Sequence, residues 1–248
     1  YMRYPENYYF HIDLDAFFAA VYLLNHPEHK GLPIIVGADP KKGKGRGVVS
    51  TCSYEARDYG VHSAMPISRA YHLCPHAIFV KVNFEQIREI SNHVMTILRN
   101  FSEIFEQTSI DEAYLDCTEL CENFHVAFQI AQKIKEKVKS ETGVTCSIGV
   151  SYSKTLAKIG SDYHKPDGIT IITPHNYKKL LEKLPITRIP GIGKKTKNYY
   201  HKRGYFVLGD FYSKKLSIIR GDLGKNGVWA WRAAHGLDQR KIHKGDRH

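Results

Sequence analysis

The sequence lacks the features that mark disulfide-stabilised, zinc-binding and membrane-spanning proteins. Its five cysteines are scattered over 248 residues, which argues against a disulfide-stabilised secreted domain and for reduced thiols. Cys117, Cys121 and His125 are four residues apart, but no second Cys or His pair lies near them, so we expect no zinc site. No apolar run approaches the ~20 residues that span a bilayer, and the N-terminal residues do not resemble a signal peptide. We therefore expect a cytoplasmic protein with no membrane partner.

Acidic residues are scarce in only one part of the chain. Residues 1–174 hold 18 Lys and Arg against 20 Asp and Glu, whereas residues 175–248 hold 18 against 5. The whole chain has a net charge of +11, and its 42% hydrophobic residues are enough for a buried core. A near-neutral body with a strongly basic C-terminal segment indicates a polyanionic partner, with nucleic acid the first choice and a membrane surface the second.

Two adjacent carboxylates, Asp111 and Glu112, stand between two β-prone runs at 104–108 and 113–116. Adjacent acids repel each other, so folding alone gives little reason to place them there. A solvated hairpin turn is the more common role of such a pair. A divalent cation is the alternative, because hard oxygen atoms are the ligands that Mg²⁺ takes. The rest of the chain has to decide between the two.

A third acid, Asp13, ends the first predicted strand. Residues 8–14 predict a buried strand, followed by a helix at 16–22 that Asp15 is placed to N-cap. Asp15 therefore has a structural role, whereas none is evident for Asp13.

The order of elements brings the three acids together. If residues 17–83 are set aside, strands at 8–14, 104–108, 113–116 and 145–150 alternate with amphipathic helices at 84–101 and 124–139. This order, βαββαβ, is the ferredoxin-like split βαβ pattern of an α+β fold. A right-handed crossover makes the first two strands parallel, so their carboxyl ends lie on one edge of the sheet. The sequence therefore favours a metal site at Asp13, Asp111 and Glu112.

Two further positions are candidates for binding phosphate. Tyr54 and Arg57 are three residues apart on a predicted short helix, and a phenol beside a guanidinium can grip a phosphate chain. Pairing of Arg57 with a surface acid is the alternative. Lys165, in a turn before a strand at 169–172, is placed to reach the edge with the three acids. A solvated lysine is the alternative there.

The basic segment contains a candidate module for binding DNA. The run Pro190-Gly191-Ile192-Gly193-Lys194 lies between predicted helices and is typical of the hairpin in a helix–hairpin–helix. Its glycines let backbone N–H groups approach a phosphate, and Lys194 and Lys195 add sequence-independent charge.

Together these elements predict two-metal phosphoryl or nucleotidyl transfer. Two Mg²⁺ ions would be held by the carboxylates, one to activate a 3′-hydroxyl and the other to neutralise a triphosphate and its leaving pyrophosphate. Three carboxylates suffice because Mg²⁺ keeps waters and phosphate oxygens as its other ligands.

Six motifs follow one another along the chain, at residues 10–18, 50–57, 63–66, 109–116, 165–168 and 189–193. With them the chain resembles the Y-family translesion DNA polymerases, most closely the DinB (polymerase IV) branch, over nearly its whole length. The resemblance implies a catalytic palm at 1–16 and 83–172, a fingers insertion at 17–82 and an all-α helix–hairpin–helix thumb at 173–240. Residues 241–248 would begin a linker to a little-finger domain that this chain lacks.

The resemblance also implies roles for individual residues. Asp13, Asp111 and Glu112 would be the catalytic metal ligands, joined by the backbone carbonyl of Leu14, with Mn²⁺ as a substitute for Mg²⁺. The nucleotide would be bound by Phe17, Phe18 (the steric gate against a ribose 2′-hydroxyl), Thr51, Tyr54, Arg57 and Lys165. DNA would be bound by Gly191, Gly193, Lys194 and Lys195.

The expected activity is distributive, low-fidelity synthesis on primer–template DNA with dNTPs, without proofreading. We expect a monomer of the cytoplasmic, bacterial, nucleoid-associated type, with a sliding clamp as partner only through the missing C-terminal region. Two alternatives stay open. One is a non-catalytic helix–hairpin–helix DNA-binding scaffold, and the other is a nucleotidyl cyclase on the same palm topology.

Overall fold

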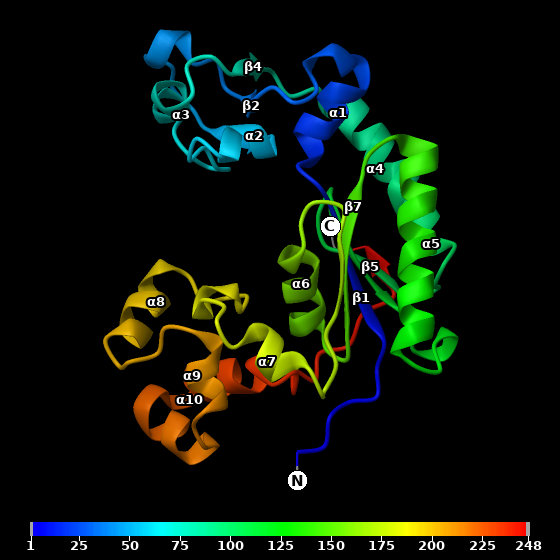
Figure 1. Ribbon diagram of the computed structural model, residues 1–248, viewed down its shortest axis with the longest axis vertical. Coiled ribbons are helices and arrows are strands. Elements are labelled where there is room, and N and C mark those ends of the chain that lie inside the picture. The colour runs from blue at the N-terminus through cyan, green and yellow to red at the C-terminus, as the bar shows by residue number, and fades with distance from the viewer. Residues whose placement is uncertain (1, 247–248) are drawn as a thin grey trace. The chain divides into compact units, whose positions relative to one another are not determined.

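The computed structural model describes residues 2–246, and the chain forms two compact units (Figure 1). The larger unit comprises residues 1–13, 98–136 and 146–248, and the smaller unit comprises residues 14–97 and 137–145. Residue 1 of the predicted palm and residues 247–248 of the predicted linker lie outside the described residues. Two long helices, α4 (Phe84–Arg99) and α5 (Phe124–Thr142), contribute residues to both units.

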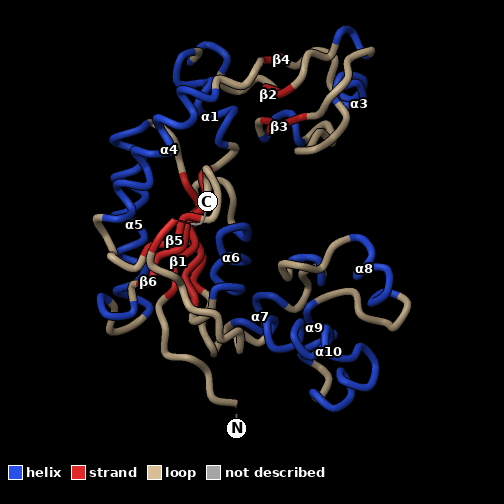
Figure 2. The backbone as a smooth tube through the Cα atoms, turned by 180° about the vertical axis from the view of Figure 1, so that it is seen from behind, coloured by secondary structure: helices blue, strands red, loops and turns tan. Residues whose placement is uncertain are grey.

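The larger unit is built on a six-stranded sheet with the order β8-β7-β1-β6-β5-β9. Figure 2 shows the strands in red, with β1, β5 and β6 labelled side by side. Its strands are β1 (Tyr9–Leu14), β5 (Phe105–Gln107), β6 (Glu112–Asp116), β7 (Cys146–Ser151), β8 (Ile169–Ile171) and β9 (Gly245–Asp246). β6 is antiparallel to both β1 and β5, so β1 and β5 are parallel to each other. The central order β7-β1-β6-β5 is that of a ferredoxin-like βαββαβ sheet, which confirms the predicted α+β fold.

Helix α6 (Lys154–Tyr163) packs closely on this sheet. Ser153 caps its first turn by accepting a hydrogen bond from the backbone N–H of Leu156. The close approach to β7 depends on Gly149, where an added Cβ would lie 1.9 Å from the carbonyl oxygen of Ala157. Lys154 and Lys158 are one turn apart on this helix and so project from the same face.

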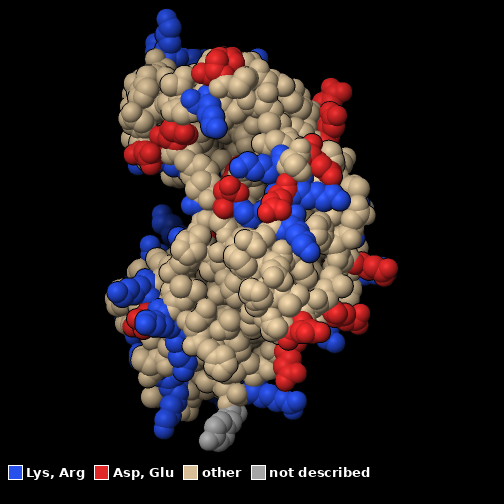
Figure 3. Space-filling model, turned by 45° about the vertical axis from the view of Figure 1, so that its right-hand side comes forward, with Lys and Arg blue, Asp and Glu red and all other residues tan. Residues whose placement is uncertain are grey.

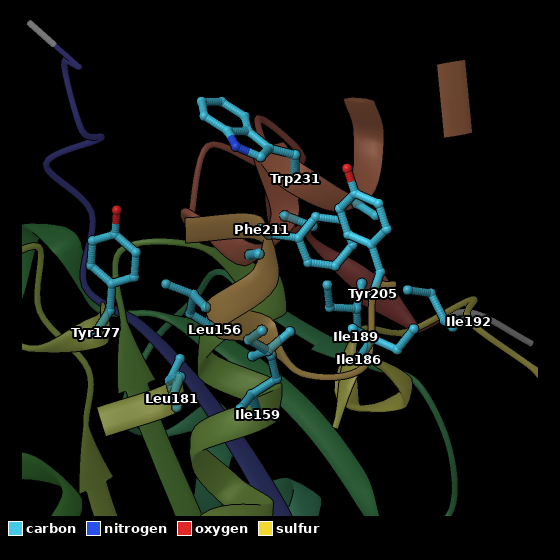
Figure 4. Close-up of a cluster of buried hydrophobic side chains, with 14 of the residues drawn as sticks. Leu156, Ile159, Tyr177, Leu181, Ile186, Ile189, Ile192, Tyr205, Phe211 and Trp231 are labelled. Carbon is cyan, nitrogen blue, oxygen red and sulfur yellow. The ribbon is translucent and has the colours of Figure 1, made fainter. Parts of the chain in front are cut away.

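The predicted thumb segment, residues 173–240, shares a hydrophobic core with helix α6 (Figure 4). Its helices are α7 (Tyr177–Leu181), η4 (Ile186–Arg188), α8 (Lys194–His201), α9 (Leu208–Tyr212) and α10 (Leu216–Ala234). Buried side chains at Tyr205, Phe211 and Trp231 pack together with apolar residues of α6 and α7. The predicted all-α character of this segment is confirmed for the described residues.

Residues 238–246 run along the larger unit instead of projecting from it. Arg240 pairs with Asp238, which also accepts a hydrogen bond from the Thr155 hydroxyl at 2.8 Å. Ile242 is buried, and β9 adds to the sheet in parallel with β5. The sequence indicated only a polar, linker-like tail here, because a two-residue strand held by backbone bonds leaves no hydrophobic pattern.

The smaller unit contains a three-stranded sheet with the order β3-β2-β4. Its elements are α1 (Phe17–Asn25), η1 (Pro27–His29), β2 (Ile34–Gly37), η2 (Lys41–Gly43), β3 (Val49–Cys52), α2 (Tyr54–Arg57), α3 (Ile67–Leu73) and β4 (Ile78–Val80). β4 was not expected from the sequence. The remaining short helix of the chain, η3 (Thr118–Leu120), belongs to the larger unit.

One predicted cap is wrong. Helix α1 begins at Phe17 after Ala16, and no side chain caps it. Asp15 instead accepts a hydrogen bond from the Thr145 hydroxyl at 2.7 Å, so its carboxylate joins two distant parts of the smaller unit.

Within residues 2–246, no helix is long and apolar enough to cross a membrane.

Candidate active site

Strand register brings the three predicted carboxylates to one end of the larger sheet. In the antiparallel β1–β6 ladder, Asp13 is paired directly with Glu112. Asp111 is the residue before β6, and its carboxylate accepts a hydrogen bond from the Ser109 hydroxyl at 2.7 Å. The turn is closed by backbone bonds from Thr108 and Ser109 to the carbonyl of Glu112. Residues almost a hundred positions apart in the sequence therefore share one end of the sheet.

Two lysines compensate the charge of these acids. Lys165 Nζ lies 2.7 Å from Asp13 Oδ2 and 2.9 Å from Asp162 Oδ1. Lys158 Nζ lies 3.3 and 3.2 Å from the two carboxylate oxygens of Glu112. The sequence predicted that Lys165 reaches this edge of the sheet, and the structure places it there. The Lys165 ammonium contacts carboxylates in the structure, whereas the sequence suggested a phosphate-binding role.

Burial dominates the electrostatics of the site. Asp13 is only 7% exposed, and burial raises its pKa above the ordinary value. Lys165 opposes this rise, while the neighbouring Glu112 and Asp111 add to it. Burial also raises the pKa of Asp111. Burial would lower the pKa of Lys165, but Asp13 and Asp162 more than offset that and raise it, so Lys165 stays charged.

A buried histidine lies directly behind Glu112. His11 is fully buried in β1, and its Nδ1 lies 2.6 Å from the Ser161 hydroxyl. That hydroxyl donates its only proton to the carbonyl of Lys158, so His11 Nδ1 must be the donor in the pair. Burial and the nearby lysines hold the pKa of His11 well below its usual value, so its Nε2, 3.9 Å from Glu112 Oε1, carries a lone pair.

The donor set suits a hard divalent cation. Three carboxylates lie at one end of the sheet, and two of them have raised pKa values. Added positive charge there would offset both the cost of burying the carboxylate charges and the repulsion between them. Among residues 2–246, no group of three acidic, His or Cys side chains is already gathered as a ligand cluster. The lysine ammonium groups on Asp13 and Glu112 now supply the compensating charge at those two carboxylates.

The predicted phosphate-binding pair lies in the smaller unit. Ser53 caps α2, and the guanidinium of Arg57 stacks over the Tyr54 ring at 4.7 Å from its centre. Arg57 Nε also donates to the Cys52 carbonyl at 3.3 Å. Thr51 is in the adjoining strand β3. The two side chains share a face as their spacing predicts.

The two predicted aromatic residues begin helix α1 of the same unit. Phe17 is buried, whereas Phe18 is half-buried against Ala19, Ile34 and Val36. The Phe18 ring lies edge-on to Phe84 at 6.4 Å. Leu14, whose carbonyl is a predicted ligand, ends strand β1 with its side chain buried.

The hairpin before α8 has the expected geometry. Gly191 has a φ of +92°, a conformation that favours glycine, and Gly193 is the N-cap of α8. Ile192 between them is buried and anchors the hairpin in the thumb core. Lys194 and Lys195 are exposed in the first turn of α8. On the face shown in Figure 3, Lys and Arg side chains gather along the lower left margin.

Sequence reasoning missed three residues that contact the predicted site residues. Lys158 and Asp162 contact Glu112 and Lys165, and His11 lies behind Glu112. The three-residue spacing of Asp162 and Lys165 was a usable signal, because side chains three residues apart can meet where a helix ends. No comparable signal pointed from α6 to Glu112.

The model of the impB/mucB/samB family matches residues 12–162 of the chain. The chain is 47% identical to DNA polymerase IV 2 of Methanosarcina mazei over 92% of its own length and 62% of the relative. The chain thus spans less than two thirds of that relative.

Two solved structures are similar over nearly the whole chain. DinB from Sulfolobus solfataricus matches with a TM-score of 0.84 and 31% identity, covering 97% of this chain and 70% of that one. The insertion ternary complex of Dbh DNA polymerase matches with a TM-score of 0.85 and 33% identity, covering 97% and 71%.

Proposed function

The chain belongs to the impB/mucB/samB family of Y-family DNA polymerases, and on that premise we propose that it carries the catalytic core of a translesion polymerase. The core would add deoxynucleotides to a primer 3′-hydroxyl on a DNA template. Synthesis would be distributive and of low fidelity, with no proofreading. The observation that carries the proposal is the pairing of Asp13 with Glu112 across β1 and β6, next to Asp111.

Asp13, Asp111 and Glu112 would hold two divalent cations, with the Leu14 carbonyl as a further ligand. When bound, Mg²⁺, or Mn²⁺ in its place, would supply positive charge to the primer hydroxyl and to the triphosphate. Lys165, which now contacts Asp13, would bind a triphosphate oxygen of the nucleotide, since both partners are anionic oxygen acceptors.

The smaller unit would bind the incoming nucleotide. Arg57, held in place by the Tyr54 ring and the Cys52 carbonyl, would bind phosphate with its terminal nitrogens. Tyr54 and Thr51 would add hydroxyl donors. Phe18 would act as the steric gate, because a ring packed against Phe84 and the strand residues has little room to yield to a 2′-hydroxyl.

The thumb would hold primer–template DNA through Gly191, Gly193, Lys194 and Lys195. Such contacts are made to phosphates, so they position the duplex without reading its sequence. We propose that the core acts as a monomer in the cytoplasm, near the nucleoid.

Primer extension tests the proposal directly. Glu112→Gln and Asp111→Asn should each lower the extension rate by at least about 10³-fold, because each removes a carboxylate charge that would hold the divalent cations. Binding to primer–template DNA, followed by fluorescence anisotropy, should persist in both variants. Glu119→Gln, an exposed acid of the same unit, is the control and should extend normally. Persistent extension by both site variants would overturn the catalytic assignment of Asp111 and Glu112, whereas DNA binding without extension by the wild-type chain would favour the non-catalytic scaffold.

A further inference from the structure

The turn that carries Lys165 is held in a strained conformation. Asp167 has a φ of +58°, in the left-handed region that a non-glycine residue rarely adopts. At the next residue, Gly168, an added Cβ would lie 1.9 Å from the carbonyl oxygen of His164. A turn with such geometry persists only when contacts from outside it fix its conformation.

Lys135 of α5 supplies such a contact. Its ammonium donates to the Asp167 carboxylate and to the Cys146 carbonyl, the latter at 2.9 Å. The Lys135 side chain is only 14% exposed. One cation therefore joins α5, the first residue of β7 and the turn, and the three bonded residues, Lys135, Cys146 and Asp167, all lie in the larger unit.

The same turn places Lys165 on the acidic sheet end. Lys165 is two residues before Asp167 and bonds to Asp13 at 2.7 Å. On the sheet side, the Gly168 carbonyl accepts from the backbone N–H of Ile148 at 3.0 Å. The turn is thus bonded to both α5 and β7, and these bonds hold it where the Lys165 ammonium reaches the acidic end of the sheet.

We propose that Lys135 is a positioning residue for nucleotide binding, acting through Asp167 and the turn to aim Lys165. The inference rests on the proposed function, in which Lys165 binds the triphosphate. Without the Lys135 ammonium, Asp167 loses a charged partner and the strained turn loses its link to α5. Lys165 would then spend less time in the orientation that meets the nucleotide, while the carboxylates that perform the chemistry would be unaffected.

Steady-state extension by the 248-residue chain tests this. Lys135→Met should raise the KM for dNTP by roughly three- to tenfold and leave kcat within about twofold, because a binding contact weakens and the reacting groups stay in place. Lys135→Arg should restore most of the wild-type KM, since a guanidinium can span the same two acceptors. Lys133→Met, an exposed lysine of the same helix, is the matched control and should change neither constant.

A double-variant cycle separates positioning from general loss of stability. In a Lys165→Met background, which should itself raise the KM, Lys135→Met should add no further rise, because its target is gone. An equal further rise would overturn the inference and leave the proposed function standing. If Lys165→Met alone left the KM unchanged, the nucleotide role of Lys165 would fail, and the inference with it. Asp167→Asn should reproduce the effect of Lys135→Met, and a wild-type KM in that variant would also overturn the inference.

Discussion

The buried ion pair between Lys154 and Glu106 gives the sharpest prediction about stability. Lys154 begins α6 and is 5% exposed, and Glu106 lies in β5 and is fully buried. Their charged atoms lie 3.0 Å apart. Glu106 Oε2 also accepts the backbone N–H of His243 at 2.9 Å, and the Lys154 ammonium lies over the Tyr114 ring at 4.7 Å. The pair therefore joins α6, the sheet and residues 238–246.

Removing one partner should be costly because it leaves the other charge buried alone. We expect Lys154→Met or Glu106→Gln to lower the free energy of unfolding by about 3–5 kcal/mol. For a chain of this length, the loss corresponds to a fall in Tm of roughly 6–20 °C. The double variant should lose much less than the two single losses combined. In it no charge is buried, and the amide oxygen introduced by Glu106→Gln can still accept from His243.

Urea unfolding of the four proteins, followed by far-UV circular dichroism, measures the coupling between the two residues. A coupling energy of at least about 2 kcal/mol is expected for a desolvated pair. Two additive losses of less than about 1 kcal/mol would mean that the pair is solvated, and would refute the reasoning. The control is Lys244→Met, since Lys244 is exposed and lies 3.8 Å from the exposed Glu103, so its loss should fall within about 0.5 kcal/mol.

Three further predictions address other parts of the molecule. Burial lowers the pKa of His235 to about 4, so the stability it contributes is present above its ordinary pKa of 6.5 and is lost as pH falls towards 4. Between pH 6.5 and 4 the free energy of unfolding of the wild type should therefore fall by about 3 kcal/mol more than that of His235→Gln. Phe18→Ala should admit ribonucleotides in primer extension, and unchanged sugar discrimination would remove Phe18 from the gate. Neutralising Lys194 and Lys195 with Gln should weaken DNA binding and reduce the slope of log K against log salt by about 2, and an unchanged slope would place the phosphate contacts elsewhere.

Several features of the fold could be predicted from the sequence because they depend on local pattern. The stripe of apolar residues at 84–101 has the helical period, and the run at 8–14 is typical of a buried strand; the structure has α4 and β1 there. The order of these elements then restricted the topology to one compatible with the observed strand order.

The position of the three acids of the candidate site could be predicted because it depends on strand order. Once β1 and β5 are known to be parallel, Asp13 and the pair Asp111-Glu112 must lie at one end of the sheet. The assignment of metal, nucleotide and DNA roles, by contrast, came from the resemblance to a family. Spacing alone left the acids, Arg57 and Lys165 open to ordinary structural interpretations.

The sequence by itself therefore determined the strands and helices of the βαββαβ order, the fold class and the meeting of three carboxylates, since these follow from the apolar pattern and from the handedness of crossovers. Only the tertiary structure decided which cations face these acids. Lys165 meets Asp13 across 152 positions and Lys158 meets Glu112 across 46, and nothing in local spacing specifies such pairs. The same holds for Asp15 with Thr145 and for the Lys135 anchor of the turn. Each depends on where two distant backbones come to lie, which is fixed by packing of the whole unit and not by any short stretch of residues.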